Sequence, residues 1–405
     1  MYFKACSWLF IKKIFSLSAA VWLLCSANAI ASPAKPQPQE FPVNPLEITT
    51  PDPLLPATSP PTAAEQQKLA QALDELASQA QFRFNAKDKP GAFAIWNREL
   101  RLRRVLGLQA ETQALGRVGA IAWSDNERLQ VQFITERLNT IWQQNKAQPQ
   151  PDLQFLSTLG YAFQQLRVPK SALEVYTQIL SIQRKQNSAA VQNTLQTIAE
   201  LHLSWFDYPQ AIASYNELLK LAQANSDRPK VVSCLQQLVY IYDRAKQYKE
   251  AVATKEQLLA LYQQQNLVNE VPPLYLAIAS DYEALDRIAQ AFSNYQSAYT
   301  SAWALQQFYQ AGDALRNLID LYNSQGQTEE ALQTSQILLQ ADEQAANIYG
   351  MMNTYDRIGQ LNTKLGRYPE ALSAFQNGLN LAKQLQYQEE YFTSQIAGIN
   401  QRLPK

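Results

Sequence analysis

Residues 208–215 read YPQAIASY, and the same arrangement returns as YPEALSAF at residues 368–375. In both stretches a small residue stands three places after a tyrosine, and an aromatic residue stands four places after the small one. Spacings of three and four place these side chains on one face of a helix. The stretch therefore predicts one amphipathic helix of a packed helical unit.

The small residue of this stretch recurs at a fixed interval along the chain. By subtraction, 251 − 211 = 40, and the same interval of 40 holds for all five clear copies: Ala211, Ala251, Ala291, Ala331 and Ala371. Ala92, Val131 and Ala172 extend the series toward the N-terminus less regularly. Twelve places before the five alanines stands a mostly small set: Ala199, Val239, Ala279, Ile319 and Gly359. A period of about 40 residues is typical of stacked helix pairs.

Helix-breaking residues fall between the expected helices. Gly326 and Gly366 are placed to end a first helix, where a left-handed backbone favours glycine. Proline is tolerated in the first turn of a helix because no backbone donor is needed there. The prolines that fit this position are Pro169, Pro209 and Pro369 for second helices, and Pro272 and Pro273 for a first helix. Each unit is therefore predicted to be two helices joined by a short turn.

These units resemble the tetratricopeptide repeat (TPR) family, in a long variant of about 40 residues per repeat instead of 34. One half of the resemblance is carried by Leu235, Leu238, Val239 and Tyr242, and the other by Tyr368, Ala371 and Phe375. It covers about residues 66–400 of the chain. It implies an all-α fold, namely a right-handed superhelical solenoid of about eight helix-turn-helix repeats. The family's usual role is to hold a peptide or a partner domain in a concave groove.

The N-terminus carries the pattern of a signal peptide over residues 1–31. Lysines come first, an apolar run covers residues 14–24, and small residues precede a cleavage site expected after Ala31. The alternative is a membrane anchor that is not cleaved. Cleavage would leave Cys234 as the only cysteine, so export is predicted from this segment alone, to the periplasm or the thylakoid lumen.

The rest of the chain is expected to divide into four parts. Frequent proline predicts a disordered linker over residues 32–65. Degenerate TPR-like repeats are expected at 66–150 and regular TPR repeats at 151–383. A capping helix is expected at 384–405, because a terminal repeat must cover its apolar face.

The family resemblance implies which side chains face the concave groove, namely positions 2, 5, 9 and 12 of each first helix. This surface is polar and carries more acid than base, so it suits a basic or amide-rich partner segment. The alternative is that these side chains are merely solvated. The predicted groove residues are Gln196, Glu200, Gln236, Tyr240, Asp243, Arg244, Glu283, Arg316, Asp320, Asn323, Asp356 and Gln360.

Residues that carry catalytic chemistry are scarce. The single histidine, His202, stands where other repeats have tyrosine, so a packing role is expected for it. Cys234 is expected to be a small packing residue. No glycine-rich phosphate loop is present, and the formal net charge is zero, which gives no general attraction for nucleic acid. The arginines at 98, 101, 103 and 104 are interpreted as a solvated helix face, with an anion-binding surface as the alternative. We therefore expect neither an enzyme nor a cofactor.

Two functions remain at this stage. The first is a protein–protein interaction scaffold or assembly factor outside the cytoplasm. Its architecture is similar to Gln-rich exported TPR proteins of cyanobacteria that act in photosystem biogenesis, which makes association with a membrane complex part of the hypothesis. The alternative is a periplasmic divalent-metal carrier of the Mn or Ca type, because carboxylates are the oxygen ligands that such ions prefer. Its ligands would be the groove acids Glu200, Asp243, Glu283, Asp320 and Asp356.

Overall fold

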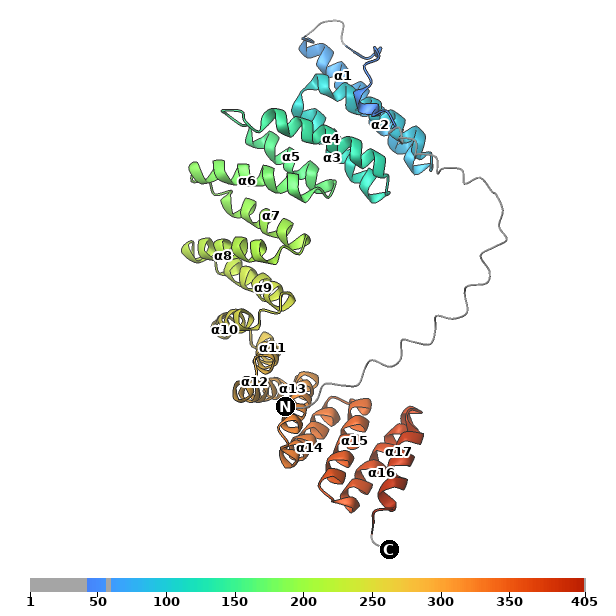
Figure 1. Cartoon of the computed structure of the whole chain (residues 1–405), viewed down its shortest axis with the longest axis vertical. Coiled ribbons are helices and arrows are strands. Elements are labelled where there is room, and N and C mark those ends of the chain that lie inside the picture. Colours follow the sequence, from blue (N-terminus) through green and yellow to red (C-terminus); the bar gives the residue numbers. More distant parts are fainter. Residues whose placement is uncertain (1–41, 56–59, 404–405) are drawn as a thin grey trace, which may run out of the picture.

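The computed structural model describes residues 42–55 and 60–403, and within them it contains α-helices and short 3₁₀ turns but no strand. The α-helices form eight antiparallel pairs followed by a single helix, so the prediction of an all-α solenoid of about eight helix pairs is confirmed. Figure 1 shows the pairs stacked into an open, curved array with its two ends far apart. In the middle of the array the odd-numbered helices α9, α11 and α13 lie toward the inner side of the curve (Figure 1).

The helix bounds follow the 40-residue period closely in the second half of the chain. The pairs are α1 (Ala63–Asn85) with α2 (Lys89–Arg103), α3 (Leu108–Ser124) with α4 (Arg128–Asn145), α5 (Leu153–Gln165) with α6 (Pro169–Lys185), α7 (Val191–Ser204) with α8 (Tyr208–Ala224), α9 (Arg228–Arg244) with α10 (Tyr248–Gln264), α11 (Val271–Ala284) with α12 (Ile288–Ala304), α13 (Phe308–Ser324) with α14 (Thr328–Gln344), and α15 (Ile348–Lys364) with α16 (Tyr368–Leu385); α17 (Glu389–Asn400) follows.

Every turn within a pair is closed in the same way. The second residue after the first helix takes a left-handed backbone, and the next N–H donates to a carbonyl five residues back, as from Arg367 to Asn362 at 2.9 Å. Gly326 and Gly366 occupy the left-handed position with φ 74°, as predicted. Other pairs place a residue with a Cβ there, and these residues are Lys87, Asn126, Arg167, Phe206, Lys246 and Asp286.

Small residues mark the points where the two helices of a pair approach most closely. The five regularly spaced alanines are fully buried. Gly359 shows why this position is small where the second helix supplies an aromatic ring: a Cβ there would lie 2.6 Å from Cε1 of Phe375. Gly160 has the same relation to Tyr176, at 2.9 Å from Cε2. The aromatic ring of the second helix therefore packs against the small residue of the first helix.

Residues 42–55, which we call the N-terminal strap, correct the prediction of a disordered linker over 32–65. Leu46 is 1% exposed in the core of the first repeats, and the Arg98 guanidinium donates two hydrogen bonds to the Asp52 carboxylate, at 2.7 and 2.9 Å. The buried leucine and the paired charges hold this segment in place, although its proline content alone predicts a linker. Helix α1 also starts earlier than predicted, at Ala63, with a Thr62–Glu65 capping box.

The arginine cluster at 98–104 is not a solvated face, so that interpretation was wrong. Arg101 donates to the Pro45 carbonyl at 2.7 Å, and Arg104 donates to the Leu46 carbonyl at 2.8 Å. Two buried glutamates, Glu99 of the same helix and Glu111 of α3, accept from four arginines, namely Arg103 and Arg117 for Glu99, and Arg104 and Arg137 for Glu111. A run of arginines indicates a solvated helix face only when no buried acid and no other segment of the chain packs against it.

The C-terminal end of the array is covered by α17, which packs on α16. Phe392 of α17 is fully buried against Gly378, where a Cβ would lie 2.3 Å from the ring. At the other end of the chain, the predicted signal peptide at 1–31 lies outside the described residues. Among the residues that are described, no helix combines the length and apolar character needed to cross a membrane.

Candidate partner-binding surface

The inner surface of the solenoid is built from equivalent positions of successive odd-numbered helices, and the predicted groove residues lie on α7, α9, α11, α13 and α15. Tyr240 is 46% exposed and lies with its ring 5.4 Å from the Arg244 guanidinium. Seven other predicted groove residues are also exposed, namely Glu200, Gln236, Asp243, Arg244, Glu283, Asp320 and Gln360. The remaining four are half-buried, namely Gln196, Arg316, Asn323 and Asp356.

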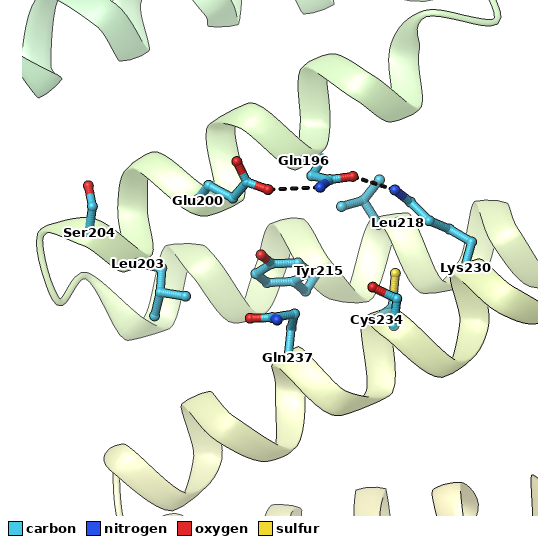
Figure 2. A pocket seen from close by; sticks show the side chains of 10 residues that line it. Gln196, Glu200, Leu203, Ser204, Tyr215, Leu218, Lys230, Cys234 and Gln237 are labelled. Carbon is cyan, nitrogen blue, oxygen red and sulfur yellow. Dashed lines mark hydrogen bonds between the residues drawn. The ribbon is translucent and has the colours of Figure 1, made fainter. Parts of the chain in front are cut away.

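One cavity of about 330 Å³ opens between α7 and α9 (Figure 2). Gln196 donates to Glu200 at 2.8 Å and accepts from the Lys230 ammonium of the next repeat, so the two helices are linked across the cavity. Tyr215 from α8 forms part of the lining, and burial together with the nearby Glu200 raises its pKa to about 12. This cavity presents an amide, a carboxylate and an ammonium group to a bound molecule.

The two residues singled out for possible reactivity are both held in packing environments. Cys234 is buried in the core beneath this cavity, and burial raises the pKa of its thiol, which keeps the sulfur protonated. His202 is half-buried, with Nδ1 3.0 Å from Oδ2 of Asp207 in the turn between α7 and α8. The two side chains lie in different places, and neither forms a hydrogen bond with the other that would make a thiol–imidazole pair.

A buried lysine replaces the aromatic residue of the repeat in α10. Lys255 is 3% exposed, and its ammonium donates to Asp243 at 2.8 Å and to Asp281 at 2.7 Å. Asp281 lies on α11 and is itself buried, and this burial raises the pKa of its carboxyl group despite the lysine. The carboxylate of Asp243, a predicted groove residue, is thus held in place by the buried ammonium of Lys255.

A second cavity of about 540 Å³ lies between α13 and α15. Arg316 lines it, but its guanidinium donates to Asp342, a carboxylate that is almost fully buried, at 3.3 Å, and to Asp313 at 2.8 Å. Arg316 is therefore committed to two carboxylates of this chain and stabilises the packing of these repeats. Arg357 donates to Asp320 at 2.5 Å and links the same two repeats.

The last predicted groove residues are engaged by the C-terminal helix. Tyr391 of α17 donates to Asp356 at 2.8 Å, and Gln360 donates to the same carboxylate at 2.8 Å. Burial raises the pKa of Asp356, against the lowering effect of these two hydrogen bonds. The C-terminal helix thus limits the accessible inner surface at α15.

The five acids of the metal hypothesis do not converge. Each accepts from a different neighbour: Glu200 from Gln196, Asp243 from Lys255, Glu283 from Tyr295, Asp320 from Arg357, and Asp356 from Tyr391 and Gln360. Within residues 42–55 and 60–403, no three histidine, cysteine or acidic side chains are grouped closely enough to hold a metal ion. The geometry therefore gives this hypothesis no support.

The sequence prediction missed the inner surface of the first repeats, on α3 and α5. A cavity of about 580 Å³ lies between these helices, and Tyr161 beside it is 58% exposed. A signal was present: Tyr161 stands eight residues before the start of α6, just as Glu200 and Tyr240 stand eight residues before α8 and α10. The irregular spacing of the first repeats hid this equivalence.

The period, the left-handed turns and the small-to-aromatic contacts within each pair together define the architecture. The chain is a TPR-like helical-repeat protein. Its helices are those of a TPR-type unit lengthened to about 40 residues, as the resemblance implied.

No family model and no curated protein matches this TPR-like chain. Many solved structures do resemble it, at low identity. The crystal structure of BtubC from P. vanneervenii is 17% identical with a TM-score of 0.37, covering 54% of this chain and 90% of that one. A MamA protein is 20% identical with a TM-score of 0.35, covering 48% and 93%. Naa15/Naa10 bound to HypK is 16% identical with a TM-score of 0.45, covering 72% and 39%. These likenesses concern the fold alone.

Proposed function

We propose that this TPR-like chain is a non-catalytic scaffold or assembly factor that holds an extended segment of a partner protein on its inner surface. The observation that carries the proposal is the series of cavities between consecutive odd-numbered helices, each lined by polar side chains from both. An extended segment can place successive side chains into such a series while its backbone bonds to the amides between them.

The charge of the inner surface from α7 to α15 favours a basic or amide-rich partner segment in this proposal. Glu200, Glu283 and Asp313 are exposed there. Asp243 and Asp320 keep further carboxylate oxygens accessible beside their own cations. Charged rim groups of this kind steer encounter and select partners more than they add affinity.

We further propose that the scaffold works outside the cytoplasm, in the periplasm or the thylakoid lumen, in the assembly of a membrane complex of a cyanobacterium. The N-terminal pattern of lysines, apolar run and small residues supports export. Expression of the full chain with a C-terminal tag, followed by fractionation and N-terminal sequencing of the recovered protein, tests this part. Recovery from the cytoplasm with residues 1–31 intact would overturn it.

The binding proposal is tested by affinity capture of the tagged chain from crosslinked membrane extracts, beside a Tyr240→Ala/Arg244→Ala variant. These two residues are chosen because they contact each other and are exposed, whereas Arg316 holds a buried carboxylate and its loss would disturb folding. We expect a specific partner to be captured by the parent chain and depleted with the variant.

The matched control for this capture removes charge elsewhere. Lys220 and Lys249 are exposed on the even-numbered helices α8 and α10. The Lys220→Ala/Lys249→Ala variant is expected to capture the partner as the parent chain does. If the inner-surface variant and the control capture the same proteins in the same amounts, the inner surface is not the binding site.

A further inference from the structure

The inner surface of α3 and α5 differs in chemistry from the surface that follows it. Two adjoining cavities, of about 580 and 430 Å³, share Ala120 and Gln165 and run from the middle of these helices to their C-terminal turns. We call them together the N-terminal cleft. The lining residues that matter here are Thr112, Arg117, Trp123, Thr158, Tyr161 and Arg167.

A buried hydroxyl in the cleft lacks a hydrogen-bond partner. Thr112 is 0% exposed, and its Oγ1 makes no hydrogen bond to any described residue. Thr158, on the opposite helix, instead donates back to a backbone carbonyl and accepts from Gln109. A buried hydroxyl without a partner is costly and uncommon, so the free Oγ1 marks a place for a polar group of a bound molecule.

The charge of the cleft is positive. None of its lining residues is acidic. Of its two arginines, Arg117 is already bound to the buried Glu99 at 2.7 and 2.8 Å, whereas Arg167 forms no ion pair with any residue that the structure describes. On its far side Arg167 also lines a cavity together with Glu200, whose carboxylate accepts from Gln196. A carboxylate of the partner is the complement of Arg167.

Exposed rings border the same cavities. Trp123 is 49% exposed beside Arg167, and Tyr161 is 58% exposed at the centre of the cleft. Exposed aromatic side chains next to an arginine are the residue types that dominate binding energy at protein interfaces. Here they offer flat apolar surface to a side chain that lies next to the carboxylate.

From these observations we infer that the N-terminal cleft binds an acidic, aromatic-containing extended segment of a partner protein. A partner carboxylate pairs with Arg167, a ring or apolar side chain packs on Trp123 and Tyr161, and a polar group of the segment bonds to Thr112 Oγ1. This inference rests on the proposed scaffold function and adds a second specificity to it. The inner surface then binds a partner whose segment is acidic along α3 and α5 and basic along α9 to α15.

The test uses the purified full chain and three fluorescein-labelled peptides that share one aromatic centre and differ only in their flanks, which carry Asp/Glu, Asn/Gln or Lys. We expect the acidic peptide to bind about tenfold more tightly than the amide peptide, since one charge-assisted bidentate pair separates them. Arg167→Gln should remove this preference, and Tyr161→Ala should weaken both peptides. Lys170→Gln, an exposed neighbour on α6, should change neither.

Two features keep the outcome interpretable. Arg167 has a φ of 56°, a left-handed backbone that glycine adopts without strain. Arg167→Gly therefore removes the same charge, and it serves as a second variant if Arg167→Gln fails to fold. The Lys-flanked peptide with the Tyr240→Ala/Arg244→Ala variant tests the scaffold function in parallel. If the Lys peptide binds and the acidic peptide does not, the inference about the cleft is wrong and the scaffold function stands.

If none of the peptides binds, the proposed scaffold function itself fails. Binding of homopolymeric single-stranded RNA in preference to the acidic peptide would also overturn the inference, because exposed rings beside an arginine can stack on bases. Equal affinity for the acidic and amide peptides, unchanged by Arg167→Gln or Arg167→Gly, would exclude the role of the arginine.

Discussion

At the scale of the residue, the turns show which sequence features are obligatory and which are tolerated. Gly326 and Gly366 adopt φ 74°, and Lys246 and Asp286 adopt the same left-handed backbone in equivalent turns. Residues with a Cβ are strained in this region by about 1–2 kcal/mol. The left-handed turn is therefore imposed by the packing of the pairs, and glycine only relieves its strain.

Gly366→Ala tests this point cleanly, because a Cβ at Gly366 would meet no atom within 4 Å. We expect the free energy of unfolding in urea to fall by about 1 kcal/mol, from backbone strain alone. Gly398→Ala is the control: its Cβ is equally unobstructed, but it lies within helix α17 without a positive φ. That change should be neutral or stabilising, by up to about 1 kcal/mol. Equal losses in both variants would contradict the role given to φ.

Lys255 tests the cost of the buried charge pair. In Lys255→Met the carboxylate of Asp281 stays buried without its cation, so we expect the unfolding free energy to fall by about 3–5 kcal/mol. The double variant Lys255→Met/Asp281→Leu removes both charges and should lose less than the single variant, measured by urea denaturation under the same conditions. Additive losses from the two substitutions would show that the pair is not coupled.

At the scale of the element, the helices were predictable and the strap was not. Period, small residues and turn residues are local signals, and they indicate the helix pairs from α7 to α16 in their order and spacing. The strap depends on Leu46 entering a core formed by distant helices and on arginines some fifty positions away, as the pairs Asp52–Arg98 and Pro45–Arg101 show. No local pattern reports contacts of that separation, and proline content points the other way.

The strap should come loose when its buried anchor is shortened. Leu46→Ala removes a side chain that is 1% exposed, with an expected cost of about 2–5 kcal/mol to this contact. We expect faster limited proteolysis within residues 42–62 and faster amide hydrogen exchange in α2. Ile48→Ala alters an exposed neighbour and should leave both rates unchanged. Unaltered proteolysis of the Leu46 variant would mean that the arginine bonds alone hold the strap.

The same contrast applies to the candidate site. Positions on the inner surface could be located from the repeat, because one phase of the helix faces inward throughout. Their availability could not be predicted, since it depends on partners from other repeats. Arg316 is committed to a buried carboxylate and Asp356 to the C-terminal helix, whereas Tyr161 was missed where the repeat spacing drifts.

At the scale of the whole molecule, the inner surface has two chemical halves. The cleft at α3 and α5 has no acidic lining residue, and acids appear from Glu200 onward. The net charge of zero conceals this separation. A partner that spans both halves would be fixed in direction as well as in position, since reversing it would bring like charges together.

The C-terminal helix should determine whether the array remains a single chain. A chain that ends after Leu385 would expose the surface that Phe392 covers on α16. We expect this truncated chain to self-associate in sedimentation velocity experiments, in proportion to its concentration, because terminal repeats with an apolar face need a cap. A chain that ends after Arg402 is the control and should sediment as the parent does. Identical behaviour of both chains would show that the cap is dispensable for solubility.

The two ends of the array have a further consequence for how copies of this chain can meet. Stacked repeats are heterologous surfaces, so an uncovered first end would fit an uncovered last end of another copy, and the contact would repeat without closing into a ring. Here α17 lies over the last pair and turns exposed polar and acidic side chains outward, whereas the strap crosses α2 and α4. A cap at one end is enough to prevent this head-to-tail stacking, so the inner surface of one copy does not continue into that of the next.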